Sequence, residues 1–260
     1  MDIIHAIVLG LVEGITEFLP VSSTAHLIIT SHLLGIPQTD YQKFFEVFIQ
    51  AGAILAVVIL YFQYILKHRK LMAPLLVSFV PTAIVGLLLH KIIKGVLFDS
   101  MGTIAVSLAL IGIVFIVVER LVATNRLKLQ KSLEGISLKD ALIIGIVQSL
   151  AVVPGVSRAG AVIVSMMFLR YKREDAALYS FLLAVPTILA ASLYDLYKSK
   201  DLLMHSQNNL AVLAVGSVVS FVVAYLSVRW LIGYLRNNTL VLFGYYRIVL
   251  AIIVVLLFLI

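Results

Sequence analysis

The stretch EGITEFLPVSSTAH, residues 13–26, brings carboxylates, hydroxyls and a histidine together in an otherwise apolar sequence. Glu13 and Glu17 are four residues apart, so a helix places both carboxylates on one face. The two like charges repel each other, and each costs about 2.5–3.5 kcal/mol inside a membrane on insertion scales. Two functions would explain the pair. It binds a hard divalent cation such as Mg²⁺ or Ca²⁺, or one carboxylate acts as a general acid or base.

The residues that follow predict an anion site at a helix start. Pro20 ends one helix, and Ser22 or Ser23 caps the next one. The free N–H groups of a first helical turn favour phosphate above other anions. Thr24 adds a third hydroxyl to bind substrate, and His26, three residues after Ser23, is expected to share its face and exchange a proton with it.

A second break, VPGVSRAG at residues 153–160, supplies a cation. Pro154 and Gly155 interrupt the helix, Ser157 can cap the next one, and Arg158 places a fixed charge at membrane depth. An isolated arginine there is strongly disfavoured, so Arg158 should face a carboxylate or an anionic ligand. Its guanidinium can hold two phosphate oxygens at once.

The two breaks belong to an internal repeat. Sliding the chain by 135 residues aligns residues 6–25 with residues 141–160 without a gap. Glu13 then meets Gln148, which is expected to hydrogen-bond in the site, and Ser23 meets Arg158. Repeats of this kind place the functional site where their broken helices meet, near the membrane midplane. Carboxylates, an arginine, hydroxyls and helix N-termini at one point describe a site for a metal-bridged phosphate ester or diphosphate.

The elements that must position these groups are membrane spans. The 260 residues are 62% hydrophobic and only 13% charged, and the apolar residues come in blocks of about twenty. Six full spans are predicted: 41–66, 72–90, 101–120, 175–196, 210–231 and 239–260. Residues 3–34 and 137–169 are each broken midway and predict re-entrant hairpins. The fold class is therefore an all-α polytopic membrane protein of one domain, residues 1–260.

Each half, about 1–130 and 131–260, contains one hairpin and three spans. Three is odd, so the halves insert with inverted topology. The first residues lack a basic segment, and we expect no cleavable signal peptide. The chain has no cysteine, which excludes disulfides and thiolate chemistry.

Basic residues divide unequally between the two sides of the predicted membrane. Thirteen fall on one side: Lys67, Arg69, Lys70, Arg120, Arg126, Lys128, Lys131, Lys139, Arg170, Lys172, Arg173, Arg229 and Arg236. Five fall on the other: Lys43, Lys91, Lys94, Lys198 and Lys200. The positive-inside rule puts the larger group in the cytoplasm, so the first hairpin opens outward. No basic stripe with interleaved aromatic residues occurs, and nucleic-acid binding is excluded.

Two further charged residues lie inside spans. Glu46 is early in its span and could line the cavity. Arg247, inside the last span, is expected to pair with a carboxylate, unless it extends its charged end to the membrane surface.

EGITEFLPVSSTAH and PGVSRAG together resemble the undecaprenyl-diphosphatase (bacitracin-resistance) family of integral membrane phosphatases, over essentially the whole chain. The resemblance implies metal-dependent hydrolysis of undecaprenyl diphosphate to undecaprenyl phosphate and inorganic phosphate at the outer face of the bacterial plasma membrane. This reaction recycles the lipid carrier for peptidoglycan and other cell-wall polymers. The family's second box usually carries a Ser and a Thr where this chain has Ala159 and Val162, so those hydroxyls cannot be essential here.

Carried over by position, the resemblance makes Glu13 and Glu17 the metal-binding and catalytic pair. Ser23 becomes the candidate nucleophile, His26 its proton-transfer partner and Arg158 the diphosphate clamp. Either Ser23 attacks phosphorus, or a metal-bound water attacks while Ser23 holds the phosphate. A lipid-phosphate flippase using the same site is the alternative function. A homodimer is left open.

Overall fold

The computed structural model describes residues 1–92, 100–198, 207–258 and 260, and these residues are helical almost throughout. Six helices are long: α3 (Asp40–Lys67), α4 (Met72–Ile92), α5 (Met101–Ala123), α8 (Arg173–Lys198), α10 (Gln207–Asn237) and α11 (Val241–Phe258). Four are shorter: α1 (Ile3–Thr16), α2 (Ser23–Leu33), α6 (Leu138–Ser149) and α7 (Arg158–Phe168). Single 3₁₀ turns occupy Arg69–Leu71, Leu133–Gly135 and Leu150–Val152.

The six long helices are apolar enough and long enough to cross a membrane, which confirms the predicted spans and the all-α membrane class. Their outer faces carry large exposed apolar side chains, such as Phe62, Leu226 and Trp230, as expected of surfaces that face lipid. The largest difference lies in α10, which continues six residues beyond the predicted end at 231. The helix there continues through residues 232–237, in which the buried Leu235 keeps packing against the core before the polar Arg236 and Asn237 end the helix.

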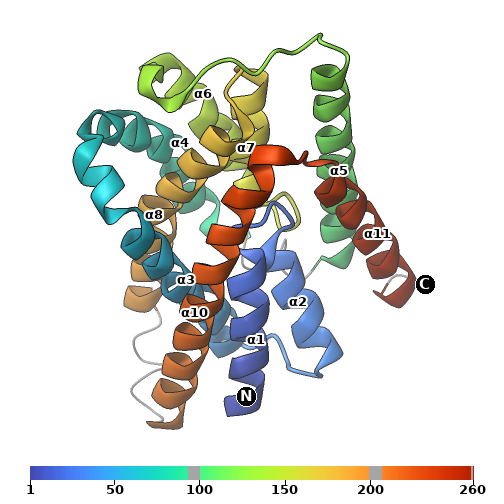
Figure 1. The fold of residues 1–260 in the computed structure, drawn as a ribbon. Helices are drawn as coiled ribbons and strands as arrows, with labels where there is room; N and C mark the ends of the chain where they lie inside the picture. Colours follow the sequence, from blue (N-terminus) through green and yellow to red (C-terminus); the bar gives the residue numbers. More distant parts are fainter. Residues whose placement is uncertain (93–99, 199–206, 259) are drawn as a thin grey trace.

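The four shorter helices form two hairpins, each broken where proline or glycine predicted it. The chain leaves α1 at Thr16 and re-enters a helix at Ser23, and it leaves α6 at Ser149 and re-enters at Arg158. In Figure 1 the α1–α2 hairpin begins and ends at the lower side of the view, whereas α6–α7 begins and ends at the upper side. The turns of both hairpins meet in the middle of the bundle. Opposite directions of this kind are what two repeats of inverted topology would have.

The two halves also match in their element bounds. Helix α7 begins and ends 135 residues after α2, the offset of the sequence repeat. The residues that precede these two helices, Ser22 and Ser157, have φ values of 74° and 73°, in the left-handed region that is uncommon for residues other than glycine. The repeat is therefore visible in backbone conformation at the breaks themselves.

Each hairpin packs on a long helix from the other half, α1 on α10 and α6 on α4. Glycines that align in the repeat allow this close approach. A Cβ atom at Gly145 would overlap the backbone of Ser78 on α4, and one at Gly10 would lie 2.7 Å from the carbonyl oxygen of Gly216 on α10. The hairpins are thus held between the halves, where the breaks can face each other.

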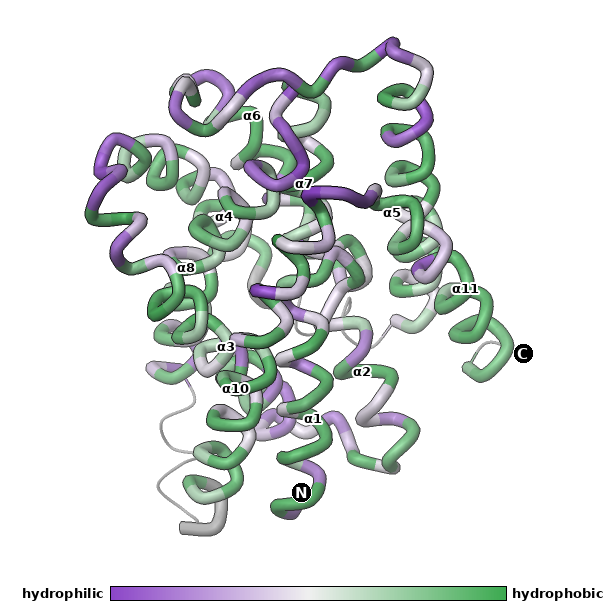
Figure 2. Tube along the Cα trace, viewed as in Figure 1, coloured by the Kyte–Doolittle hydropathy of each residue, from purple (hydrophilic) through white to green (hydrophobic). Residues whose placement is uncertain are grey.

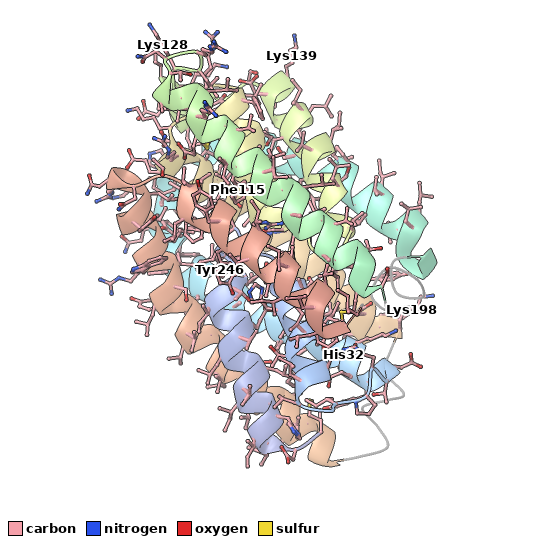
Figure 3. The ribbon with its side chains drawn as sticks, turned by 90° about the vertical axis from the view of Figure 1, so that its right-hand side faces the viewer. His32, Phe115, Lys128, Lys139, Lys198 and Tyr246 are labelled. Carbon is pink, nitrogen blue, oxygen red and sulfur yellow. The ribbon has the colours of Figure 1, made fainter. Side chains whose placement is uncertain are left out.

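Polar residues gather at the two ends of the bundle. Figure 2 shows mostly hydrophobic helices, with hydrophilic stretches in the loop that joins α5 to α6 and at the turn between α3 and α4. Lys128 and Lys139 lie at one end in Figure 3, and Lys198 and His32 lie toward the other. This separation follows the two predicted groups of basic residues; Lys94, Lys200 and the side chain of Lys91 lie outside the described residues.

Candidate active site

The carboxylate of Glu17 is where the two breaks meet. Glu17 follows the last residue of α1, and its side chain is 7% exposed. Its Oε2 accepts a hydrogen bond from the hydroxyl of Ser23, the first residue of α2. Its Oε1 accepts one from Nη2 of Arg158, the first residue of α7, at 2.6 Å. Three of the predicted site residues are therefore in direct contact.

Arg158 is held on more than one side. Its Nη1 donates to the backbone carbonyl of Ser180 on α8 at 2.8 Å, and its guanidinium lies 5.8 Å from the ring centre of Phe18. Its Nε is buried and donates to no partner among the described residues. Arg158 therefore keeps one N–H free for an added anion while Glu17 and Ser180 fix its position.

The two helix starts differ in how they are capped. The Ser157 hydroxyl accepts a hydrogen bond from the Gly160 N–H at 3.1 Å, which caps α7 as predicted. Ser22 occupies the equivalent position before α2, but its side chain makes no capping hydrogen bond. The first-turn N–H groups of α2 therefore remain available to an anion.

Both breaks are tied together by Arg247 on α11, which is fully buried. Its Nη1 donates to the carbonyl of Pro20 at 3.0 Å, and its Nη2 donates to the carbonyls of Gly155 and, at 3.1 Å, Val156. The sequence-based expectation of a carboxylate partner, or of a charged end at the membrane surface, was wrong. The non-helical backbone of the breaks leaves carbonyl groups without helical donors, and Arg247 satisfies them.

Glu13 lies one turn before Glu17 and is fully buried. Neither of its carboxylate oxygens has a hydrogen-bond partner among the described residues. Ionised carboxylates one helical turn apart repel each other. Arg158 balances the charge of Glu17, so the buried Glu13 is the carboxylate that requires a proton or an added cation.

His26 points away from the Glu17–Ser23 pair. One ring nitrogen contacts the Ser22 carbonyl at 2.7 Å and the other contacts the hydroxyl of Tyr246 on α11 at 2.6 Å. The rings of His26 and Tyr246 are also stacked, and Figure 3 shows Tyr246 midway along the bundle. Both ring nitrogens of His26 are thus engaged by partners other than Ser23. The structure therefore does not show the hydrogen bond that the predicted proton exchange between His26 and Ser23 needs.

Gln148 lies behind the site. Its Nε2 donates to the hydroxyl of Thr82 on α4 at 2.7 Å, and its Oε1 has no partner among the described residues. Thr82 lines the cavity described next, whereas Gln148 does not. Gln148 therefore positions a lining residue, and Thr82 was missed because a threonine in a span carries no distinctive sequence signal.

A cavity of about 590 Å³ opens beside these groups. Its wall is polar where the two breaks meet, at Glu17, Ser22, Ser23, Thr24, Ser157 and Arg158, and Gln50 of α3 and Asp195 of α8 add further polar groups to the lining. Apolar residues of α4 and α8 form much of the rest, including Phe79, Ala83, Leu87, Ile188 and Ala191. A cavity with a charged end and apolar walls fits a molecule with an anionic head and a hydrocarbon chain.

Glu13 and Glu17 could supply part of the coordination shell of a divalent cation. No group of three or more His, Asp or Glu side chains is placed to hold a metal within the described ranges. Glu13 and Glu17 would thus be the protein ligands, and Glu13 has both oxygens to offer. Mg²⁺ commonly takes one or two carboxylates and completes its coordination with water and substrate phosphate.

Comparison with known proteins identifies the family. The profile described as "Bacitracin resistance protein BacA" matches residues 6–253. The chain belongs to the BacA family.

Relatives in the BacA family match along almost their full length. A protein of Wolinella succinogenes named undecaprenyl-diphosphatase is 47% identical over 253 residues, 97% of each chain. Proteins with the same name from Persephonella marina and Aquifex aeolicus are 46% and 43% identical, over 97% and 96% of this chain. The region that matches the BacA profile contains both helix breaks and Arg247, so every residue assembled above lies within it.

Proposed function

We propose that this membrane protein hydrolyses undecaprenyl diphosphate to undecaprenyl phosphate and inorganic phosphate, as the names of its BacA-family relatives indicate for them. The observation that carries the proposal is the junction of Glu17 with both Ser23 and Arg158 at the polar end of an apolar-walled cavity. The diphosphate would occupy the polar end, and the prenyl chain would follow the walls contributed by α4 and α8.

Each group at the polar end has a role in this reaction. Arg158 and the uncapped start of α2 hold phosphate oxygens, since both present N–H donors to an anion. Glu17 accepts the proton of the Ser23 hydroxyl, to which it is already hydrogen-bonded. Ser23 Oγ then attacks the terminal phosphorus, and the bond from phosphorus to the bridging oxygen breaks to release undecaprenyl phosphate. Water then attacks the phosphoserine: its oxygen bonds to phosphorus, Glu17 returns the proton to Ser23 Oγ as the bond from Oγ to phosphorus breaks, and both protons of the water leave with the inorganic phosphate.

A divalent cation, Mg²⁺ or Ca²⁺, is part of the proposal. Glu13 and Glu17 would hold it, and when bound it would neutralise charge on the phosphate oxygens. The second route, in which water attacks phosphorus directly and Ser23 only orients the phosphate, uses the same residues. Trapping of a phosphoenzyme separates the two routes, because only the first one forms it.

We place the opening of the first hairpin at the outer face of the bacterial plasma membrane. The support is the position of Lys128 and Lys139 at the end of the bundle opposite His32 and Lys198, combined with the positive-inside rule. Cysteine labelling from outside at a Lys198→Cys site tests this orientation.

The direct test is phosphate release from a C55 diphosphate by the purified protein in detergent with Mg²⁺ or Ca²⁺. Release by the wild type and its loss in Glu17→Gln are expected. The two hairpins of opposite direction favour a lipid-phosphate carrier as the second candidate function. Binding of the substrate without any phosphate release would replace hydrolysis with that function.

A further inference from the structure

A second polar cluster lies between the end of α2 and the start of α3, outside the active-site cavity. It consists of Ser31, Gln38, Gln42 and Glu46, none of which lines that cavity. Glu46 is 2% exposed and lies on α3 between the buried residues Phe45 and Ile49. The expectation that Glu46 lines the cavity was wrong, because its side chain turns toward α2 and hydrogen-bonds with Ser31.

Hydrogen-bond donors in this cluster all converge on one oxygen of Glu46. Its Oε1 accepts from the Ser31 hydroxyl and from Nε2 of Gln42, both at 2.8 Å, and from Nε2 of Gln38 at 3.4 Å. Nε2 of Gln42 also donates to Ser31 Oγ at 3.0 Å. The Ser31 hydroxyl and both N–H groups of the Gln42 amide are therefore already used by acceptors inside the cluster.

Three oxygen atoms are left over. Glu46 Oε2, Gln42 Oε1 and Gln38 Oε1 are all buried and have no hydrogen-bond partner among the described residues. Buried acceptors without donors are rare in folded proteins, and a buried carboxylate oxygen without one is especially costly. The cluster therefore has an excess of oxygen ligands; His32 lies near it, but no salt bridge to Glu46 is formed within the described residues.

The buried charges around Glu46 also favour a bound cation. Glu13, Glu17 and Glu46 are all buried, and the helices that carry Glu13 and Glu46, α1 and α3, pack against each other. Arg158 forms an ion pair with Glu17. No salt bridge to Glu46 or Glu13 occurs in the part of the chain that the structure describes.

We propose that Glu46, Gln42, Gln38 and Ser31 form a binding site for a monovalent cation with oxygen ligands, for which Na⁺ is the probe. Hard cations prefer carboxylate and amide oxygens, and a site with a single carboxylate balances a single positive charge. Irregular backbone and helix ends near broken helices hold Na⁺ in other membrane proteins of this architecture. A pocket lined by His32, Gly35, Ile36, Pro37 and Gln38 gives the ion a route from the end of the bundle.

Occupation of this site would connect it to the chemistry above. Helix α2 begins with Ser23 and carries Ser31 near its end, so a cation at Glu46 would fasten α2 to α3. The position of the Ser23 hydroxyl would then depend on the ion. The four proposed ligands, Glu46, Gln42, Gln38 and Ser31, take no part in the proposed hydrolysis.

Thermal unfolding of the purified full-length protein in detergent tests the proposal. NaCl is replaced stepwise by choline chloride at constant ionic strength with EDTA present, so that general screening and divalent ions do not vary. The melting temperature should rise by roughly 3–6 °C when Na⁺ reaches ten times the dissociation constant, and should continue to rise with the logarithm of the Na⁺ concentration above that point. Equal melting temperatures in the two salts would overturn the proposal.

Variants locate the site. Glu46→Gln should abolish the dependence on Na⁺, whereas Glu13→Gln and the exposed Glu134→Gln should retain it. A dependence that persists in Glu46→Gln would overturn the assignment. If Glu46→Gln does not fold, equilibrium binding of radioactive Na⁺ to the wild type decides the matter. One saturable site per chain supports the proposal and the absence of saturable binding contradicts it.

Discussion

The hydroxyl of Ser23 donates its hydrogen bond to the carboxylate of Glu17, across the break that separates α1 from α2. The same carboxylate receives Arg158 from the opposite hairpin. One oxygen therefore faces the candidate nucleophile and the other faces the candidate phosphate clamp. Glu17 therefore both accepts the proton of Ser23 and fixes the position of the Arg158 guanidinium. Replacing Ser23 and replacing Arg158 should consequently have different effects on the reaction.

Replacing Ser23 with alanine should reduce phosphate release by roughly 10³-fold or more with little change in KM, because it removes the group that attacks phosphorus. Rates with a C55 diphosphate measure this, with Ser227→Ala on α10 as a control that should behave as wild type. A Ser23→Ala enzyme within about tenfold of the wild type would exclude the covalent route.

Replacing Arg158 with lysine keeps the charge but loses the planar fork that contacts Glu17 and Ser180 together. We expect kcat/KM to fall by about 10–100-fold, since a single ammonium group cannot make both contacts and also hold phosphate. Arg236→Lys, an equally conservative change at an exposed arginine, should leave kcat/KM unchanged. Equal effects of the two changes would argue against the clamp.

Removing divalent cations with EDTA should abolish phosphate release, and adding Mg²⁺ or Ca²⁺ should restore it. In Glu13→Gln the metal concentration for half-maximal activity should rise by about tenfold or more, because one of two carboxylate ligands is lost. A titration of activity against free metal measures both effects. Full activity in EDTA would show that the acidic pair acts without a metal.

Replacing Arg247 with methionine should destabilise the protein by about 3 kcal/mol or more, because three buried carbonyls lose their donors. The melting temperature should then fall by roughly 6–12 °C, and activity should fall with it as the breaks lose their register. Arg247→Lys should recover part of the loss, and Arg236→Met should cause none. An unchanged melting temperature in Arg247→Met would show that the hydrogen bonds of Arg247 to the two breaks do not stabilise the protein.

Replacing Gly145 with alanine should lower the melting temperature by several degrees, because the added Cβ overlaps the backbone of Ser78 and must separate α6 from α4. Gly233→Ala on α10 is the matched control. Its Cβ would meet no atom within 4 Å, so it should be neutral or raise stability by up to about 1 kcal/mol. Similar melting temperatures for both variants would show that the hairpin does not need this close contact.

Much of this architecture follows from local sequence features. The spans were predictable because a membrane requires blocks of about twenty apolar residues, and the breaks because Pro20, Pro154 and Gly155 interrupt them. The contact between Glu17 and Arg158, 141 residues apart, was predictable in outline because the repeat brings the two breaks together. These features depend on composition and symmetry, which a sequence displays directly.

Side-chain directions were less predictable. Spacing placed His26 on the face of Ser23, but its ring bonds instead to Tyr246 from the last helix, a partner 220 residues away. An arginine inside a span predicts a carboxylate partner, because a sequence displays side chains but not the backbone groups that are left free by a break in a helix. Its true partners are backbone carbonyls, which become free acceptors only where the chain leaves the helix.

The unequal caps of α2 and α7 have a consequence for the direction in which a lipid can bind. A scaffold with twofold symmetry would accept an elongated substrate in two opposite orientations, one for each equivalent half. Both helix starts line the same polar wall of the cavity, but Ser157 caps the start of α7 while the start of α2 stays uncapped, so the two halves offer a phosphate group unequal N–H donors. A single serine hydroxyl thereby makes the duplicated frame asymmetric and favours a phosphate group on the side of α2.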